Sequence, residues 1–388
     1  MGKKKLKIIG LMSGTSANGI DACLAEIENK NDKLKIKQLG FKTYEYPGYL
    51  RKEILKISEP YCQNVDEIIR LDFLLGEYFA QAAKKITRSC GLSLKDINLI
   101  GSHGQTVRHL PVKKKIGPYQ IRGTLQIGEP QIISARTGIL TVGDFRRKDI
   151  AKGGEGAPLT PLAHFHLFNK KEKAQAVLNI GGITNLTFLP QGTEVDKIWG
   201  RDFGPGNMLI DNLMRRFFKK DLDKDGRIAS KGKIIQPVLE LMLEKVLAQV
   251  KRKKSLGRED FDQKFTDALI KEGRKYSAKP EDFITTVSEL TARSVYASHK
   301  RFLEPQAEIE ELILCGGGAK NRYLYVRLKE LFYPAEVYLS DELGYNVLAV
   351  ESLSFALFAF ITLSQLSGDD SGSFVIDKTK ISGKICLP

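Results

Sequence analysis

Three segments of this chain combine apolar strands with turns of glycine and small polar residues, and such turns can bind an anion. The first is Lys7 to Glu26, where two apolar stretches flank the tip Ser13-Gly14-Thr15-Ser16-Ala17-Asn18-Gly19. The second is Ala176 to Leu189, and the third is the strand Glu311 to Cys315, which runs into Gly316-Gly317-Gly318. Because no bulky side chain intervenes, backbone N–H groups and short hydroxyls in such turns can surround a phosphate at close range. The three turns favour one ligand held from several sides.

The first segment also has a simpler interpretation. Asn18-Gly19 is a common turn signal, so Lys7 to Glu26 is typical of an ordinary hairpin. Ala176 to Leu189 repeats the plan of strand, small polar tip and strand. This repetition favours the phosphate interpretation.

Two further polar clusters follow predicted strands. Asp96 to Ile100 is typical of a short buried strand, and Gly101 to Thr106 comes directly after it. Thr141 to Asp149 combines Asp144 and Arg146 with a glycine-rich continuation. Open α/β sheets bind ligands at the carboxyl ends of their strands, so both clusters are candidates for a substrate site.

Length and composition predict a globular protein of two domains. The 388 residues exceed the size at which single cores stop growing, and two domains would leave a cleft between them. The longest apolar stretch, Val347 to Leu363, is too short and too polar for a membrane span and predicts a buried helix. Met1 to Leu6 shows no secretory or myristoylation signal, and the five scattered cysteines favour a reducing compartment. We therefore expect a cytoplasmic protein that binds no membrane.

The net charge of +15 invites a nucleic-acid interpretation. The candidate patches are Lys3 to Lys7, Lys113 to Lys115 and Lys251 to Lys254. They lack interleaved aromatic residues and match no known DNA- or RNA-binding motif. A lysine-rich solvated surface is the favoured explanation, and we expect no nucleic-acid partner.

The pattern of elements predicts an α/β protein whose two halves are related. We expect a first domain over residues 1–140, a second over residues 141–365, and a tail, 366–388, that returns to the first. Expected helices are 49–58, 65–90, 208–219, 237–251 and 347–363, with strands at 174–189 and 335–339 and an exposed loop at 112–123. Asp221 to Gly226 mimics the start of a calcium-binding loop. Gly232 stands where that loop needs a Glu, so we interpret the segment as an Asp-rich turn.

Taken together and in order, these motifs resemble the anhydro-N-acetylmuramic acid kinase family. The motifs are Gly10-Leu11-Met12-Ser13-Gly14-Thr15-Ser16, Gly101-Ser102-His103-Gly104-Gln105-Thr106, Asp144-Phe145-Arg146, Gly153-Gly154-x-Gly156-Ala157-Pro158-Leu159, Leu178-Asn179-Ile180-Gly181-Gly182, Asp202-x-Gly204-Pro205-Gly206-Asn207 and Cys315-Gly316-Gly317-Gly318-Ala319. Each motif alone is weakly specific, but their order extends over nearly the whole chain.

The resemblance implies two ribonuclease-H-like domains of the actin, hexokinase and Hsp70 type around a nucleotide cleft. It implies ATP and Mg²⁺ as cofactors, with no metal ligand assigned to a residue, and a homodimer. Family members open the 1,6-anhydro bridge of the sugar with water and transfer the γ-phosphoryl group of ATP to O6. The product is N-acetylmuramic acid 6-phosphate, and the process belongs to cell-wall recycling. The residues implied for nucleotide binding are Ser13, Gly14, Thr15, Ser16, Ala17, Asn18, Gly19, Ile20, Asp21, Gly181, Gly182, Gly316, Gly317 and Gly318.

The resemblance also implies roles at the sugar. Asp202 stands where the family keeps the base that activates water; a helix N-cap is the alternative, although Gly204 to Asn207 already supplies a cap. Arg146 suits a bidentate pair with the lactyl carboxylate or, equally, an ion pair with Asp144 or Asp149. The further residues expected at the sugar are His103, Gln105, Thr106, Asp144 and Glu351. For one of His103, Gln105 and Thr106, the alternative is to tie down the loop by hydrogen bonds.

The chain departs from the family pattern at a few positions. Asn18 stands where relatives usually carry Asp, which removes a negative charge beside the expected magnesium site. Arg201 and Phe203 flank Asp202 where relatives more often have an apolar and a small residue, and Leu256 replaces a usual Thr. These changes keep two competing hypotheses open: a catalytically weakened nucleotide or sugar binder, and a kinase for another anhydrosugar.

Overall fold

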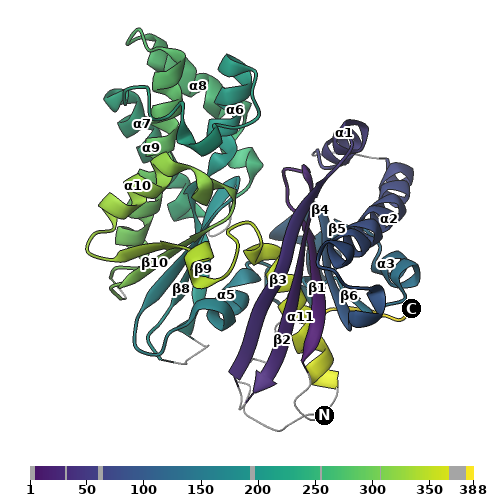
Figure 1. Cartoon of the computed structure of the whole chain (residues 1–388). Coiled ribbons are helices and arrows are strands. Elements are labelled where there is room, and N and C mark those ends of the chain that lie inside the picture. Colours follow the sequence, from purple (N-terminus) through teal and green to yellow (C-terminus); the bar gives the residue numbers. More distant parts are fainter. Residues whose placement is uncertain are drawn as a thin grey trace. The chain divides into compact units, whose positions relative to one another are not determined.

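Two compact units make up the chain in this computed structural model (Figure 1), which describes residues 5–30, 33–59, 64–192, 197–253, 256–305, 307–366 and 382–388. The first unit comprises residues 1–167 and 349–388, and the second comprises residues 168–348. Cys62 and the lysines Lys3, Lys4 and Lys254 lie outside the described residues.

The first unit is built on one mixed sheet. Its elements are β1 (Leu6–Ser13), β2 (Gly19–Lys30), β3 (Lys33–Glu45), α1 (Gly48–Ile57), α2 (Val65–Ser89), β4 (Leu99–Ile116), β5 (Tyr119–Ile127), α3 (Pro130–Thr137), β6 (Thr141–Gly143), α4 (Arg147–Ala151), α5 (Thr160–Phe168), α11 (Val350–Leu366) and β12 (Lys384–Cys386). The strand order is β12-β6-β4-β1-β2-β3, and β5 pairs with β4 outside this row. β1 to β3 form an antiparallel meander, whereas β4 and β6 run parallel to β1.

The second unit is built on a smaller sheet with the same plan. Its elements are β7 (Gln175–Ile180), β8 (Ile183–Leu189), β9 (Trp199–Pro205), α6 (Asn207–Phe218), α7 (Gln236–Arg252), α8 (Gln263–Arg274), α9 (Pro280–Phe302), β10 (Glu311–Cys315), α10 (Arg322–Leu331) and β11 (Glu336–Leu339). The strand order is β11-β10-β7-β8-β9. β7 to β9 form an antiparallel meander, and β10 and β11 run parallel to β7.

The two sheets therefore share one topology. In each, the first three strands form a meander and two later strands add in parallel on the other side of the first strand. This order and these directions are those of a ribonuclease-H-like domain. The predicted fold class, α/β with two such domains, is confirmed.

Helix α11 approaches the first sheet so closely that side chains are excluded at two points. A Cβ on Gly10 of β1 would lie 1.8 Å from the Ser352 carbonyl oxygen, and one on Gly101 of β4 would lie 2.0 Å from that of Phe355. The alternate residues Ile9 and Ile100 point to the opposite face and join the core formed with α2. Glycines on one face and large aliphatic residues on the other therefore fix how this sheet lies between its helices.

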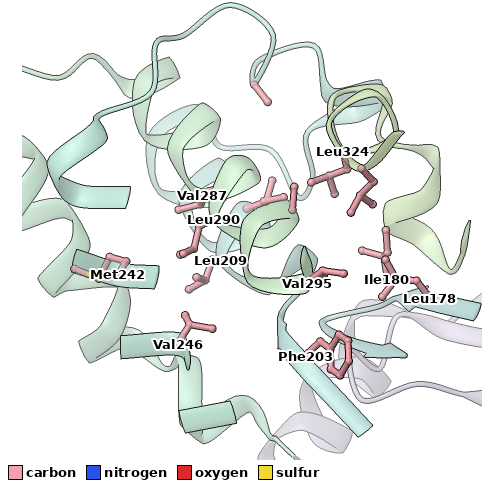
Figure 2. Close-up of a cluster of buried hydrophobic side chains, with 14 of the residues drawn as sticks. Leu178, Ile180, Phe203, Leu209, Met242, Val246, Val287, Leu290, Val295 and Leu324 are labelled. Carbon is pink, nitrogen blue, oxygen red and sulfur yellow. The ribbon is translucent and has the colours of Figure 1, made fainter. Parts of the chain in front are cut away.

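The core of the second unit lies between its sheet and helices α6, α7, α9 and α10. Figure 2 shows side chains from each of these elements converging, with Leu178 and Ile180 of β7 facing Leu324 of α10. Val246 of α7 and Val295 of α9 are fully buried in the same cluster. This packing places the amino end of α6 beside the turn that follows β7.

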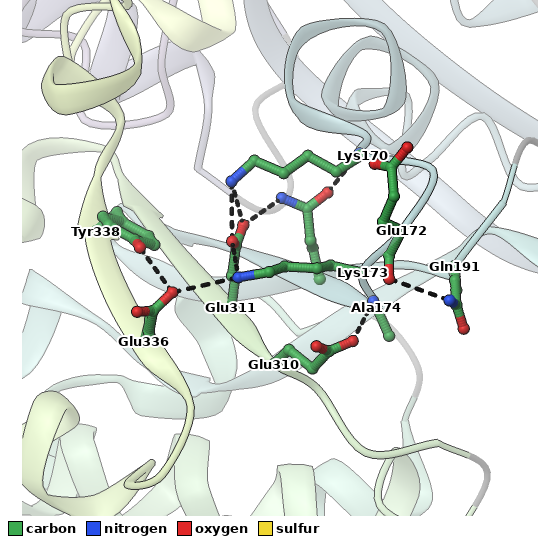
Figure 3. Close-up of polar contacts among 10 residues, drawn as sticks. Lys170, Glu172, Lys173, Ala174, Gln191, Glu310, Glu311, Glu336 and Tyr338 are labelled. Atoms are coloured by element: carbon green, nitrogen blue, oxygen red, sulfur yellow. Dashed lines mark hydrogen bonds and ion pairs between the residues drawn. The ribbon is translucent and has the colours of Figure 1, made fainter.

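A buried carboxylate fixes the start of β10 against β7. Glu311 is 1% exposed and accepts hydrogen bonds from Lys170 Nζ, 2.8 Å from each carboxylate oxygen, and from Gln175 Nε2 at 2.8 Å (Figure 3). Lys173 Nζ lies 2.9 Å from Glu311 Oε1. Burial raises the pKa of Glu311, but these donors outweigh burial and the pKa is lowered. The network anchors the first residues of β7 and β10, at the opposite ends of these strands from the glycine turns.

Most predicted elements are confirmed within a few residues, but the segment 112–123 is not a loop. It forms the exposed ends of β4 and β5, which pair as a two-stranded ribbon around the turn at Gly117. Its exposure is as predicted, with Val112 81% exposed. The Asp-rich segment is a turn, as predicted, because the Asp223 carboxylate accepts the backbone N–H groups of Ile228 and Ala229 at 2.9 Å each.

The boundaries of the two units differ from the domain boundaries expected from the sequence, which were 140/141 and 365/366. β6 follows residue 140 but pairs with β4, and α11 packs on β1, β4 and β2. Both elements therefore belong to the first unit. Of the expected returning tail, residues 384–386 form β12, which pairs with β6 in that unit.

Gly10→Ala should lower the free energy of unfolding by about 2 kcal/mol or more, because helix α11 must move to admit the methyl group. Gly48→Ala is the matched control, since no atom lies within 4 Å of a Cβ there. Urea denaturation measures both, and the control should be neutral or slightly stabilising. Equal losses in the two variants would contradict the close packing of α11.

Candidate functional site

The turn between β1 and β2 exposes small polar side chains. Thr15, Ser16 and Asn18 are exposed, whereas Ala17 is fully buried and adopts a φ of +49°. The Ala17 N–H donates to the Gly14 carbonyl oxygen at 3.0 Å. A Cβ on Gly14 would meet no atom closer than 3.9 Å. The turn is thus a tight loop with open space above its glycine, as an anion site requires.

Gln105, predicted to face the sugar, contacts this turn instead. Its Nε2 group donates to the carbonyl oxygens of Gly14 and Thr106, at 3.1 Å each. The Ser13 hydroxyl lies 2.6 Å from Gln105 Oε1 and 2.7 Å from the Gly19 carbonyl oxygen, and donates its single proton to one of them. β4 is thereby joined at Gln105 to the end of β1.

Asp21 brings a carboxylate to the base of the same turn. It lies on β2 and accepts a 2.5 Å hydrogen bond from the Thr43 hydroxyl. Burial raises its pKa from the ordinary 3.8 to about 6, although the Thr43 hydrogen bond lowers it. A carboxyl whose pKa is raised by burial beside a turn of small polar residues is a candidate for a functional position.

His103 and Arg146 form a direct pair, although 43 residues separate them in sequence. Arg146 Nε donates to His103 Nε2 at 3.0 Å, and the His103 Nδ1 N–H donates to the Gly104 carbonyl oxygen at 3.0 Å. Both imidazole nitrogens are therefore engaged, and the ring is the neutral Nδ1-protonated tautomer. Burial, followed by the Arg146 charge, lowers the pKa of His103 well below its ordinary value. His103 thus orients Arg146. Because its Nε2 lone pair already accepts the Arg146 N–H, the ring cannot act as a general base in this state.

The guanidinium of Arg146 is fixed on two sides. Its Nη1 donates to the Gly156 carbonyl oxygen at 2.7 Å, and burial lowers its pKa to about 10 while the Glu351 charge raises it. Glu351, in the first turn of α11, is thus close enough to act electrostatically on Arg146. The structure brings His103, Arg146 and Glu351 together in the first unit.

Neither of the ion pairs considered for Arg146 is among its contacts. Asp144 instead pairs with Arg147 Nε at 3.2 Å and with Lys384 Nζ at 2.9 Å. Asp149 accepts the Gly156 N–H at 2.7 Å. Asp144 therefore ties β12 to the end of β6, at one edge of the cluster around Arg146.

Thr106, also expected at the sugar, contacts the neighbouring strand. Its hydroxyl oxygen accepts a hydrogen bond from Gln126 Nε2 of β5 at 3.3 Å. The hydroxyl proton stays available to a further acceptor.

In the second unit, Gly181 and Gly182 form the turn after β7. The Gly206 N–H donates to the Gly182 carbonyl oxygen and the Asn207 N–H to that of Gly181, both at 2.8 Å. A Cβ on Gly206 would lie 2.2 Å from the Gly181 oxygen. Cβ atoms on Gly181 and Gly182 would meet nothing closer than 3.5 and 3.7 Å. The turn has room for a ligand, and Gly206 allows α6 to start directly beside it.

In the Gly316–Gly318 turn, two glycines lie against the end of β7. A Cβ on Gly316 would lie 2.2 Å from Asn179 Oδ1, and one on Gly318 would lie 2.2 Å from Ile180 Cγ2. These glycines therefore admit the end of β7 of the same chain. Only Gly317 is open, since its Cβ would meet nothing closer than 3.7 Å.

Asp202 lies on β9 and does not cap α6. Its Oδ1 accepts from Asn185 Nδ2 at 2.9 Å, and its Oδ2 accepts from the Leu256 N–H at 2.7 Å. The N-cap of α6 is Gly206, and no side chain caps it, so the N-cap alternative for Asp202 is wrong. Two donors hold the carboxylate in one orientation, and a carboxylate oxygen can accept more than one hydrogen bond.

Sequence reasoning gave Asn185 and Leu256 no role toward Asp202. Asn185 is directly opposite Asp202 in the β8–β9 pairing, next to a register shift. A polar residue on a mostly buried strand was the available signal for Asn185. The Leu256 contact uses its backbone N–H, which no residue type reveals.

No resident metal cage is formed by the part of the chain that the structure describes: no group of three or more His, Cys, Asp or Glu side chains could hold an ion there. None of the helices formed by the described residues is both long and apolar enough to traverse a bilayer.

Comparison with known proteins identifies relatives along nearly the whole chain. The family model for AnmK, anhydro-N-acetylmuramic acid kinase, matches residues 6–384. Anhydro-N-acetylmuramic acid kinase of Caldanaerobacter subterraneus subsp. tengcongensis is 39% identical over 364 residues, covering 93% of this chain and 92% of that protein. The protein of the same name from Clostridioides difficile is 40% identical over 381 residues, covering 98% and 96%.

Among solved structures, the activator of 2-hydroxyisocaproyl-CoA dehydratase from Clostridium difficile with bound ADPNP aligns with a TM-score of 0.47. It is 11% identical, and the alignment covers 95% of this chain and 99% of that one.

Asp21→Asn should raise the melting temperature of the ligand-free protein at about pH 7.5, because wild-type protein buries a charged carboxylate there at a cost in free energy. The folded-state pKa of Asp21, about 6, lies above the ordinary 3.8, so wild-type protein gains stability as the pH falls through this window. The difference between the two proteins should shrink over the same window in thermal unfolding measured at a series of pH values.

Thr43→Val serves as the second variant in this series. It removes the hydroxyl that lowers the Asp21 pKa, so its pH window should move upward. A melting-temperature difference between Asp21→Asn and wild type that does not change with pH would exclude Asp21 as the titrating group.

Proposed function

The chain belongs to the anhydro-N-acetylmuramic acid kinase family, and from this we propose which of its side chains carry the family's reaction. The protein is an ATP-dependent sugar kinase that converts anhydro-N-acetylmuramic acid into N-acetylmuramic acid 6-phosphate in peptidoglycan recycling. Water adds to the anomeric carbon C1, the bond from C1 to the bridging O6 breaks, and O6 takes the γ-phosphoryl group while ADP leaves. The family match over residues 6–384 carries this conclusion.

Asp202 is the base in this proposal. The attacking water must lose a proton as it bonds to C1, and a positioned carboxylate can accept that proton. Asn185 and the Leu256 N–H hold one carboxylate oxygen each, which supports a fixed orientation toward the water. Asn185 acts here as a positioning residue.

We propose glycine-bearing turns of each unit, taken separately, as nucleotide-binding segments. In the first unit we assign to it the turn Ser13, Gly14, Thr15, Ser16, Ala17, Asn18, Gly19, Ile20 and Asp21. In the second we assign Gly181, Gly182, Gly316, Gly317 and Gly318. The open space at Gly14, Gly181, Gly182 and Gly317 supports direct contact there. Gly316 and Gly318 contribute by shaping the turn around Gly317.

Mg²⁺ is proposed to arrive with ATP rather than to occupy a resident site. The side chains near the first turn fit this mode, because Mg²⁺ in kinases keeps several waters and takes few protein ligands besides phosphate oxygens. Asp21 and Asn18 would face its bound waters. When bound, the ion neutralises charge on the phosphates. Asn18 offers a hydrogen bond without the attraction of a carboxylate.

Arg146 recognises the lactyl carboxylate of the sugar in this proposal. Its Nε and Nη1 groups already contact His103 and Gly156, which fixes the plane of the guanidinium and the direction of its remaining N–H groups. Glu351 would accept from a sugar hydroxyl, and Thr106 would donate to one. Asp144 borders this cluster through its ion pairs and completes the proposed substrate set with His103.

We further propose that the protein acts in the cytoplasm, where ATP is available, and that it is a homodimer as its family suggests. Light scattering of the purified protein decides the second point, since a dimer has twice the mass of the chain.

Asp202→Asn should retain ATP binding and lower kcat by at least about a hundredfold, because the amide cannot accept the proton of the attacking water. Asp225→Asn is a matched control: Asp225 is an exposed carboxylate of the same unit at a φ of +59°, which Asn also tolerates. Coupled detection of ADP and of the sugar 6-phosphate gives the rates. Near-normal turnover in Asp202→Asn would remove this residue from the mechanism.

Arg146→Lys should raise KM for anhydro-N-acetylmuramic acid about tenfold or more, because Lys lacks the planar fork that pairs with a carboxylate. The same substitution should leave KM nearly unchanged for a 1,6-anhydro sugar without the lactyl group. Arg136→Lys, at an exposed Arg that pairs with Glu77, controls for the loss of a guanidinium. Equal losses on both sugars would show that Arg146 acts on something other than the carboxylate.

A further inference from the structure

Gln105 lies on β4, two residues after His103, and its buried side chain faces the turn between β1 and β2. It is 1% exposed, as is Ser13, its partner in the parallel pairing of β1 with β4. The register shifts between Leu11 and Ser13, which brings Ser13 opposite Gln105. The side-chain amide of Gln105 therefore lies where the turn between β1 and β2 leaves the sheet.

The orientation of this amide is determined by its neighbours. The Nε2 group faces two carbonyl oxygens, those of Gly14 and Thr106, at 3.1 Å each. Rotating the amide by half a turn would place Oε1 against both of these acceptors, which is unfavourable. Both amide hydrogens are thus used within the protein, and Oε1 faces the Ser13 hydroxyl at 2.6 Å.

The bond to Gly14 fixes a peptide plane in the turn. The Gly14 carbonyl oxygen accepts from Gln105 Nε2 and from the Ala17 N–H. In a planar trans peptide, the N–H of the following residue points opposite to the carbonyl. The Thr15 N–H is therefore directed away from Gln105. Gln105 sets the direction of a backbone donor at the tip of the turn.

We propose that Gln105 is a positioning residue for nucleotide binding and not a ligand of the sugar. This inference rests on the proposed function, in which the turn contacts the phosphates of ATP. Glycine at position 14 leaves the turn conformationally free, since glycine adopts many backbone angles. The hydrogen bonds from Gln105 select one of them before ATP binds. Losing them raises the cost of ordering the turn on binding.

The test is a comparison of affinities for ATP and for the sugar in Gln105→Leu. Affinity for a non-hydrolysable ATP analogue, measured by calorimetry without sugar, should fall roughly tenfold, as should KM for ATP, because two hydrogen bonds to the backbone are lost. KM for anhydro-N-acetylmuramic acid should change less than about twofold. His103→Ala should show the opposite pattern, with KM for the sugar raised and analogue binding kept.

Two further variants secure this comparison. Gln120→Leu, at an exposed Gln on β5, controls for the substitution itself and should match wild type. Gln105→Met is measured beside Gln105→Leu, because a flexible side chain fits a buried site with less strain. Circular dichroism confirms that each protein is folded at the assay temperature.

The possible results separate this inference from the function on which it rests. Wild-type protein that does not bind the analogue contradicts the proposed nucleotide site. Wild-type binding that is unchanged in both Gln105 variants contradicts the positioning role alone. A raised KM for the sugar with unchanged analogue binding would make Gln105 a sugar ligand.

Discussion

Close backbone contact between strands and the elements packed on them is the constraint on which both units depend. In the first unit, Gly10 and Gly101 admit helix α11 so closely that a Cβ would overlap its carbonyl oxygens. In the second, Gly206 lets α6 begin beside the turn after β7, and Gly316 and Gly318 pack on the end of that strand. Each contact fixes where a strand lies, and the candidate functional groups are carried by these strands, by the turns after them and by the helices packed beside them.

The glycines of the candidate nucleotide turns, together with those just named, fall into two sets. One set is occupied by the protein's own backbone and side chains and cannot be replaced without moving a helix or strand. The other set, Gly14, Gly181, Gly182 and Gly317, leaves open space. In the proposed function, these four glycines are the positions in the turns where the nucleotide approaches the main chain. The glycine motifs thus contribute to packing and, in the proposed function, to nucleotide binding.

The proposed base and the proposed carboxylate-binding arginine are both held in place before any ligand binds. Asp202 has a donor on each carboxylate oxygen, and Arg146 is held by His103 and by the Gly156 carbonyl. Such prior orientation lowers the ordering cost of binding and leaves chemistry to groups already in place. Asp21 is also held, by the Thr43 hydroxyl, and burial raises the pKa of its carboxyl to about 6.

Apolar strands and small polar turns are local signals, so the glycine turns after β1, β7 and β10 could be predicted from the sequence. The two ribonuclease-H-like domains were expected from the family resemblance. The polar cluster 101–106, expected after the end of a strand, lies within β4. The sequence could not assign Arg146 its partner. Acidic residues stand beside it in sequence, whereas His103 becomes its neighbour only because β4 and β6 are adjacent in the sheet.

The contacts of Gly316 and Gly318 with the end of β7 could not be predicted from the sequence for a similar reason. The sequence does not distinguish a glycine that leaves room for a ligand from one that leaves room for another segment of the same chain. The ribbon of β4 and β5 was missed because its Lys, Pro and Gly residues are typical of loops. Long-range contacts, not composition, decide each of these cases.

The central claim is that water attacks the sugar at C1 while ATP phosphorylates O6. The most direct measurement is one reaction of the purified protein with ATP, Mg²⁺ and anhydro-N-acetylmuramic acid in oxygen-18 water, stopped within the first turnovers and examined by mass spectrometry. We predict N-acetylmuramic acid 6-phosphate with the heavy oxygen on C1 and none in its phosphate group. Heavy oxygen in inorganic phosphate, with no sugar 6-phosphate formed, would contradict the account.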